Sequence, residues 1–156
     1  MQDSSGNDTK AIHAGETLIE RAVTQPIFQS STFVYNGEAS YGEVKYIRLN
    51  NTPNHLTLGK KIAALEYAED AVVTSSGMSA ITTALLALTS PGDHVLAQDN
   101  LYGGTYHFFK ENFPELARQV SFFPVDEAGN LDKYLRANTK VIYVESISNP
   151  LLRIPD

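Results

Sequence analysis

The chain lacks cysteine and tryptophan and has only two methionines among its 156 residues. Without cysteine, this sequence holds no disulfide, no zinc-thiolate site and no thiol nucleophile, and we predict no metal site. Basic residues are also scarce: 12 Lys and Arg stand against 18 Asp and Glu, so the net charge is −6 at pH 7. That balance disfavours nucleic acid and anionic membranes as partners.

Long apolar runs are missing as well, since none approaches the ~18 residues that cross a bilayer. The first residues are polar and acidic and show no secretory signal pattern. At 156 residues the chain has the size of one ordinary domain, and its 42% hydrophobic residues are enough to form a buried core. We therefore expect a cytoplasmic globular protein.

Residues 1–53 are predicted to form an extended N-terminal arm. Residues 1–10 have the composition of a flexible tail, and residues 11–53 show no clear period and are broken by glycine and proline. The irregular segment carries five aromatic residues: Phe28, Phe33, Tyr35, Tyr41 and Tyr46. So many aromatic side chains are expected to pack on something, either a second subunit or short strands of the same chain.

Residues 54–156 alternate between helix and strand patterns. Helices are predicted for residues 54–66, 78–88, 105–113 and 131–137, and strands for residues 71–74, 94–97, 120–123 and 141–144. Asn54 is expected to cap the first helix, Pro114 to end the third, and the run 141–144 to be covered on both faces. The alternation predicts an α/β fold, a three-layer α/β/α sandwich with a mainly parallel sheet.

The segment Ser76-Gly77-Met78 joins a predicted strand to a predicted helix. A helix N-terminus offers free backbone N–H groups and the positive end of the helix dipole, which together suit a phosphate. A turn without a ligand is the plainer interpretation of this feature alone. Neither the dinucleotide nor the Walker glycine pattern is present, so those nucleotide sites lack their signatures.

Two further segments follow predicted strands, where open parallel sheets bind ligands. Tyr102, which precedes Gly103 and Gly104, can lie on an aromatic ligand and transfer a proton through its hydroxyl; a packed loop tyrosine is the alternative. Asn149, which precedes Pro150, can donate its amide to an anionic oxygen, or only end the strand in an Asx turn.

Tyr46 and Arg48 stand two residues apart in the irregular segment. In an extended chain both side chains project to the same side, and both donate well to phosphate oxygens. A surface ion pair of Arg48 is the alternative.

Together these segments resemble the N-terminal part of the cystathionine γ-synthase/γ-lyase family, the Cys/Met-metabolism enzymes of fold type I that depend on pyridoxal 5′-phosphate (PLP). The resemblance is carried by Ala11-Ile12-His13-Ala14-Gly15, Gln25-Pro26-Ile27-Phe28-Gln29-Ser30-Ser31-Thr32-Phe33, Tyr46-x-Arg48, Ser76-Gly77-Met78-Ser79-Ala80, Leu101-Tyr102-Gly103-Gly104-Thr105 and Glu145-Ser-x-Ser-Asn149-Pro150. The segments come in the family's order and cover nearly the whole chain.

The resemblance implies PLP as cofactor and assigns residues 54–156 to the N-terminal part of the PLP-binding large domain. Ser76 and the backbone N–H groups of Gly77 and Met78 would hold the cofactor phosphate. Tyr102 would stack on the pyridine ring and act as the catalytic group in proton transfer, and Asn149 would lie near the ring oxygen.

The resemblance also implies a homo-oligomer, a dimer or tetramer with shared active sites. Tyr46 and Arg48, on the arm of residues 1–53, would reach the phosphate of a neighbouring subunit's cofactor. The whole enzyme would be a lyase or transferase that makes or breaks a C–S bond on cystathionine, methionine or an O-acyl-homoserine.

Two departures from the family pattern qualify these implications. Proline comes one position later than in the family's Tyr-Ser-Arg-x-x-Asn-Pro-Thr segment, at Pro53. The family's Schiff-base lysine has no counterpart among the seven lysines, Lys10, Lys45, Lys60, Lys61, Lys110, Lys133 and Lys140. We therefore expect an N-terminal portion that is inactive alone, with the remainder as a possible separate chain. The alternatives are another fold-type-I enzyme, an aminotransferase or desulfurase, and a non-catalytic oligomer-forming remnant.

Overall fold

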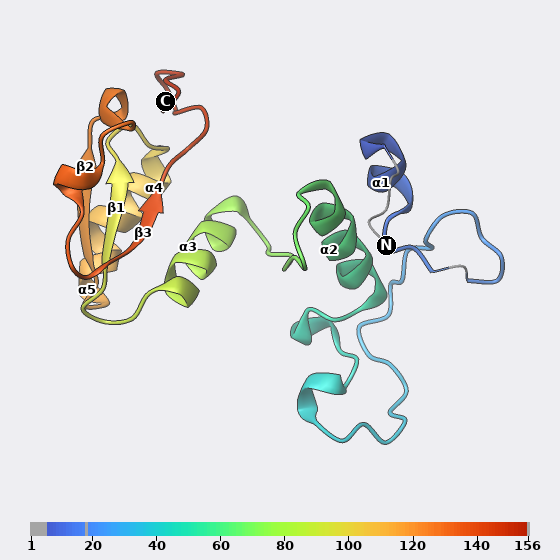
Figure 1. The fold of residues 1–156 in the computed structure, drawn as a ribbon. Helices are drawn as coiled ribbons and strands as arrows, with labels where there is room; N and C mark the ends of the chain where they lie inside the picture. The colour runs from blue at the N-terminus through green and yellow to red at the C-terminus, as the bar shows by residue number, and fades with distance from the viewer. Residues whose placement is uncertain (1–5, 18, 156) are drawn as a thin grey trace. The chain divides into compact units, whose positions relative to one another are not determined.

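The computed structural model describes residues 6–17 and 19–155 (Figure 1). The chain divides into two compact units, Met1–Val73 and Thr74–Asp156. The first unit contains α1 (Asn7–His13), the 3-10 turns η1 (Tyr41–Glu43) and η2 (Ile47–Leu49), and α2 (Pro53–Leu65). None of the helices within the described ranges combines the length and apolar character that a membrane crossing requires.

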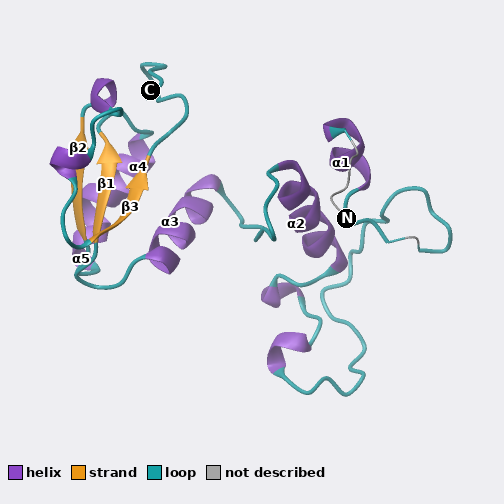
Figure 2. Ribbon diagram, in the orientation of Figure 1, coloured by secondary structure: helices purple, strands orange, loops and turns teal. Residues whose placement is uncertain are grey.

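The second unit contains all the named strands of the described residues (Figure 2). Its elements are α3 (Gly77–Leu88), β1 (His94–Gln98), α4 (Gly103–His107), η3 (Phe108–Asn112), α5 (Phe113–Glu115), β2 (Gln119–Phe123), η4 (Val125–Glu127), η5 (Asp132–Tyr134) and β3 (Thr139–Tyr143).

Helix α1 begins inside the predicted flexible tail, so that prediction is wrong for residues 7–10; residues 1–5 lie outside the described residues. Lys10 on α1 is only 8% exposed, and its ammonium lies 4.5 Å from the centre of the Tyr67 ring. A lysine stem can cover apolar surface while its charge rests on an aromatic face. Composition alone gave no sign of this anchor, because it depends on a residue far along the chain.

Helix α2 begins at Pro53, where a fixed φ suits the first helical position. The predicted cap at Asn54 is wrong, because Thr52 is the N-cap residue. Asn54 instead accepts a hydrogen bond from the Phe28 N–H at 3.0 Å and donates one to the Phe28 carbonyl at 2.7 Å. Its amide therefore ties the irregular segment to α2.

The predicted strand 71–74 is also wrong, since these residues have no regular secondary structure. The Val73 carbonyl accepts from the Asn50 side chain at 2.8 Å rather than from a neighbouring strand. A Cβ on Gly59 would lie 2.7 Å from the Ala71 carbonyl oxygen, so α2 runs directly against this segment. Residues 71–74 are thus held by contact with α2 and by the hydrogen bond from Asn50, and not by hydrogen bonds to a neighbouring strand.

The second unit is built on a parallel sheet with the strand order β2-β1-β3. All five residues of the central strand β1 are buried, as expected for a strand with neighbours on both sides. The predicted α/β class with a parallel sheet is confirmed. In Figure 1, α4 and α5 lie against one face of this sheet.

The core of this unit lies between that face and the helices. Leu85 of α3 packs with Val95 and Ala97 of β1 and with Phe109 and Phe113. The helical segment continues through Pro114, so the predicted stop before this proline is wrong. A π turn precedes it, in which the Phe113 N–H donates to the Phe108 carbonyl. Pro114 then follows inside the same continuous helical segment, directly after the π turn.

The other face of the sheet is covered by turns at β2. The helix predicted for 131–137 is wrong: only the 3-10 turn Asp132–Tyr134 forms, and the Tyr134 ring lies 6.3 Å from that of Phe123. The prediction that 141–144 is covered on both faces is wrong as well. Ile142 and Val144 are each 47% exposed, whereas Val141 and Tyr143, which alternate with them, pack against the core.

Candidate functional site

The N-terminus of α3 presents backbone donors, as its sequence predicts. The Ser76 hydroxyl caps the helix by accepting from the Ser79 N–H at 3.0 Å, and the Ser76 carbonyl accepts from Ala80. The N–H groups of Gly77 and Met78, the first two of the helix, have no intrahelical partner. Nothing lies within 4 Å of the position that a Cβ on Gly77 would take. Two backbone donors therefore remain at a capped helix end, with open space at the Cβ position of Gly77.

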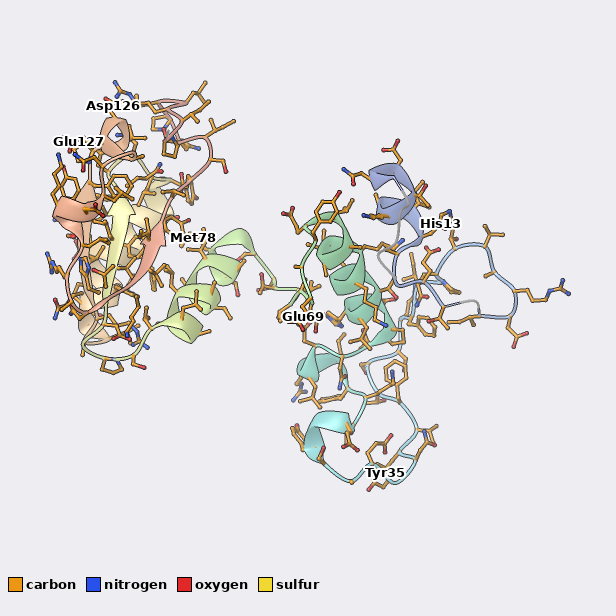
Figure 3. The ribbon with its side chains drawn as sticks, viewed as in Figure 1. His13, Tyr35, Glu69, Met78, Asp126 and Glu127 are labelled. Carbon is orange, nitrogen blue, oxygen red and sulfur yellow. The ribbon has the colours of Figure 1, made fainter. Side chains whose placement is uncertain are left out.

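The N-termini of α3 and α4 meet at Gly104. A Cβ on this residue would lie 2.7 Å from the Tyr102 ring and 3.2 Å from the Met78 sulfur. The Thr105 hydroxyl also lies 3.8 Å from that sulfur. Figure 3 shows Met78 projecting from α3. The missing side chain of Gly104 thus lets two of the predicted site residues approach each other, although 24 positions separate Met78 from Tyr102 in the sequence.

Tyr102 is the N-cap residue of α4, and its side chain is 50% exposed. Tyr143, the last residue of β3, is by comparison a packed tyrosine. The Tyr143 ring stands edge-on to Phe109 at 5.4 Å, and burial raises the pKa of its hydroxyl. Tyr102, by contrast, is half exposed and its ring lies close to Gly104.

Asn149 lines a cavity of about 300 Å³ at the carboxyl ends of the strands. The same cavity is lined by Asp99, Asn100, Leu101, Gly103, Tyr106 and Pro150. The turn that follows β3 is made by Ser148, whose hydroxyl accepts from the Arg153 N–H at 2.9 Å and whose carbonyl accepts from Leu152. The hydrogen bonds that close this turn are therefore made by Ser148.

Tyr46 and Arg48 belong to the first unit, and the other predicted site residues to the second. Tyr46 is extended, as expected, but the prediction is wrong for Arg48, because residues 47–49 form the 3-10 turn η2. The two side chains are nevertheless neighbours: the Arg48 guanidinium lies 5.3 Å from the centre of the Tyr46 ring. The Tyr46 and Arg48 side chains are thus brought together by a cation–π contact and not by the alternation of an extended strand.

Two asparagines precede the shifted proline, and their side chains form hydrogen bonds to the backbone of this loop and of Val73. The Asn51 side chain accepts from the Tyr46 N–H at 2.9 Å and donates to the Val44 carbonyl at 2.8 Å. Asn50 adopts a left-handed conformation with φ 55° and reaches Val73. Asparagine tolerates that conformation better than most residues.

The arm of residues 11–53 forms only one isolated bridge, between Thr32 and Tyr46, among its described residues. Tyr35 and Tyr41 are 65% and 73% exposed, so they are not packed on strands of the same chain.

Sequence reasoning missed Glu145 and Gln98 as parts of this site. Both carboxylate oxygens of Glu145 accept from the Tyr102 N–H, and Gln98 accepts from the Glu145 N–H. Glu145 was visible as a polar residue directly after a predicted strand, but its partner was not.

The family model for Cys/Met metabolism PLP-dependent enzymes matches residues 8–156. The chain belongs to this family. The resemblance inferred from the sequence is therefore confirmed, and the family assignment identifies PLP as the cofactor. The donors at Gly77 and Met78, the space beside Gly77 and the half-exposed Tyr102 fit a phosphate and an aromatic ring.

Individual relatives support the same assignment. The chain is 37% identical to the homocysteine synthase of Schizosaccharomyces pombe, in a match that covers 99% of this chain and 38% of that protein. It is 37% identical to the L-methionine gamma-lyase of Fusobacterium nucleatum subsp. polymorphum, over 97% of this chain and 40% of the relative.

The crystal structure of metB from Corynebacterium glutamicum matches the fold with a TM-score of 0.89 at 31% identity. That match covers 100% of this chain and 41% of the solved chain. The chain thus spans well under half the length of these family members.

Proposed function

We propose that this chain supplies the phosphate and ring-face contacts for PLP in an enzyme that makes or breaks a C–S bond of an amino-acid substrate such as cystathionine, methionine or an O-acyl-homoserine. The observation that carries the proposal is the meeting of α3 and α4 at Gly104, which puts the Tyr102 ring beside the Met78 end of α3. Relatives whose names concern homocysteine and methionine support the substrate class.

The phosphate would be held at the start of α3. The free N–H groups of Gly77 and Met78 donate to its oxygens, and the helix dipole favours the negative charge. The Ser76 side chain is already engaged with Ser79, so its main role is to keep these two amides in place.

Tyr102 and Asn149 would act on the ring side. PLP supplies an electron sink for the reacting carbon. The Tyr102 ring covers one face and excludes water from it, while its hydroxyl holds or moves a proton beside the substrate. The Asn149 amide, on the cavity of about 300 Å³, donates to an anionic oxygen of cofactor or substrate.

The arm of residues 1–53 would serve a neighbouring subunit of a homo-oligomer, a dimer or tetramer. Its exposed Tyr35 and Tyr41, and Ile27 at 84% exposure, supply apolar area for such a contact. The Arg48 guanidinium beside Tyr46 would donate to the neighbour's cofactor phosphate. Residues 54–156 would belong to the PLP-binding large domain.

Replacing Gly77 tests the phosphate site directly, in the full-length protein that carries this chain. Gly77 is the first residue of α3, and Ser76 before it is extended with ψ 160°. Gly77→Pro therefore removes one donor while keeping the helix, whereas Gly77→Ala keeps the donor and adds a methyl group in open space. PLP titration followed by visible circular dichroism should show at least about tenfold weaker binding for the proline variant. Equal binding by both variants would contradict the phosphate assignment.

Turnover tests the reaction class. The loaded protein is incubated with cystathionine, with methionine, and with O-acetylhomoserine plus sulfide, and mass spectrometry follows loss or gain of the C–S bond. Exchange of amino groups without C–S chemistry would support the aminotransferase alternative. PLP binding without any turnover would support the non-catalytic remnant.

Mixed oligomers test the shared site. Arg48→Ala lies on the arm, and Tyr102→Ala on the second unit. If sites are shared, subunits of these two inactive variants regain activity when they are reassembled together, because some sites then receive both native residues. Absence of any regain would place Arg48 and Tyr102 in one subunit's site.

The cytoplasmic location expected from the sequence is kept in this proposal, and cell fractionation tests it.

A further inference from the structure

Glu145 holds the backbone of Tyr102 from the neighbouring strand. The Tyr102 N–H lies 3.0 and 3.1 Å from the two carboxylate oxygens of Glu145, which follows β3. The Tyr102 side chain provides no cap for α4, so this carboxylate is the acceptor at the helix entrance. Hydrogen bonds to an ionised acceptor are stronger than those between neutral groups.

Gln98 holds Glu145 in turn. Its side chain is fully buried at the end of β1 and accepts from the Glu145 N–H at 3.0 Å. Its amide nitrogen donates to the Asn100 carbonyl, in the loop that leads to Tyr102. One buried amide therefore connects the end of β1, the loop 99–102 and the segment after β3.

Tyr102 is consequently held on several sides. Glu145 binds its N–H, its own carbonyl accepts from the Tyr106 N–H at 3.0 Å, and its ring borders the position of a Cβ on Gly104. The ring itself stays half exposed. The polar chain thus fixes the backbone that aims the ring.

We infer that Glu145, anchored by Gln98, is the positioning residue for Tyr102. This inference deepens the proposed function and rests on it for the claim that the Tyr102 ring meets the cofactor. Glu145 does not touch the cofactor in this role; it acts through the Tyr102 N–H.

Hydrogen exchange in the cofactor-free, full-length protein tests the contact without any need for PLP. Glu145→Ala removes both acceptor oxygens and should speed amide exchange in residues 99–106 by about tenfold. Glu145→Gln retains one oxygen and should give a smaller increase. Glu111→Ala changes an exposed carboxylate on η3 and is the matched control, with exchange unchanged. Native exchange at 99–106 in Glu145→Ala, or in Glu145→Gln if the alanine variant does not fold, would overturn the inference.

A double-mutant cycle on PLP affinity then separates positioning from general stability. Glu145→Ala should weaken PLP binding in the native background but not in Tyr102→Ala, because there is no longer a ring to position. Fully additive losses would overturn the positioning role. Failure of the native protein to bind PLP would instead refute the proposed function, and the exchange experiment would still decide whether Glu145 holds Tyr102.

Discussion

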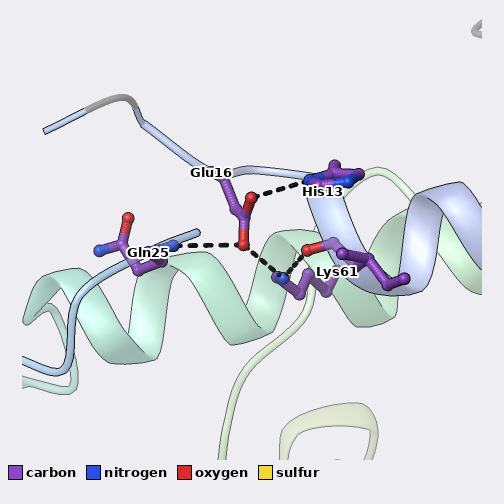
Figure 4. Close-up of polar contacts among 5 residues, drawn as sticks. His13, Glu16, Gln25 and Lys61 are labelled. Carbon is purple, nitrogen blue, oxygen red and sulfur yellow. Dashed lines mark hydrogen bonds and ion pairs between the residues drawn. The ribbon is translucent and has the colours of Figure 1, made fainter. Parts of the chain in front are cut away.

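Glu16 accepts a hydrogen bond from the Lys61 ammonium at 3.0 Å, although the two residues stand 45 positions apart (Figure 4). The same carboxylate contacts His13 Nδ1 at 3.1 Å and accepts from the Gln25 N–H at 3.3 Å. Lys61 also donates to the Ile12 carbonyl. The pair therefore fastens the end of α1 and the segment after it to α2.

The hydrogen bond from Lys61, with a smaller effect of His13, lowers the pKa of Glu16 from 4.5 to about 2. Because this carboxyl binds its proton more weakly in the folded state, its contribution to stability is present above pH 4.5 and is lost as the pH falls toward 2. Glu16→Gln should therefore flatten the loss of stability in that window. Urea unfolding of α1 and α2 at several pH values measures it. Glu69→Gln, at an exposed site, is the control and should keep the native slope.

His94 should make the second unit less stable in mild acid. Its ring is fully buried, with Thr139 and Ser121 hydroxyls at 2.8 Å from its two nitrogens. Burial, aided by the charge of Arg136, lowers its pKa from 6.5. The unfolded chain thus gains the proton first, and stability falls as the pH drops below 6.5.

His94→Gln removes the titration and should flatten the pH dependence below 6.5 in denaturant unfolding. His107→Gln changes an exposed histidine and should leave it intact. A native slope in His94→Gln would assign the acid sensitivity to another group.

Phe109 should be the most sensitive of the core aromatics. Its ring is fully buried and packs edge-on against Phe113 at 5.5 Å and Tyr143 at 5.4 Å. Phe109→Ala should lower the free energy of unfolding by about 3–5 kcal/mol, because it leaves a cavity that the sheet and helices cannot close. Ile154→Ala, at a position 68% exposed, should change it by under about 0.5 kcal/mol. Equal effects would show that Phe109 lies outside the cooperative core.

Ser76 can be changed so that capping and phosphate binding separate. Ser76→Ala loses the bond to the Ser79 N–H and should reduce stability by about 1 kcal/mol. Ser76→Asp restores a cap but places a negative charge beside Gly77, so it should be as stable as the native protein and bind PLP less tightly than Ser76→Asn. Thermal unfolding and PLP titration give the two values. Equal PLP binding by the Asp and Asn variants would argue against a phosphate at this turn.

Tyr102→Phe keeps the ring and removes the hydroxyl. Cofactor affinity should stay within about threefold of native, because the ring face remains, and kcat should fall by roughly 10²- to 10⁴-fold if the hydroxyl transfers a proton. Tyr67→Phe, at a position 77% exposed in the first unit, is the control and should retain activity. A kcat near native in Tyr102→Phe would limit Tyr102 to stacking.

Local patterns predicted the elements that carry their own signal. The β1, β2 and β3 strands and α2 and α3 were found within a few residues of their observed bounds. The errors fall where a distant partner decides. The Val73 carbonyl accepts a hydrogen bond from the Asn50 side chain and not from a neighbouring strand. The Lys10 ammonium lies over the Tyr67 ring, although a flexible tail was predicted there. The helix predicted for residues 105–113 continues past Pro114, and a π turn directly precedes this proline.

The sequence by itself determined the parallel α/β class and the family and predicted the residues of the candidate site, because glycine turns, strand-end polar residues and their order are local properties of the chain. Only the tertiary structure showed that Gly104 brings Met78 to Tyr102, that Glu145 holds the Tyr102 N–H and that Arg48 lies on the Tyr46 ring. These contacts depend on packing between segments far apart in the chain, and neither periodicity nor composition records which partner a side chain will meet.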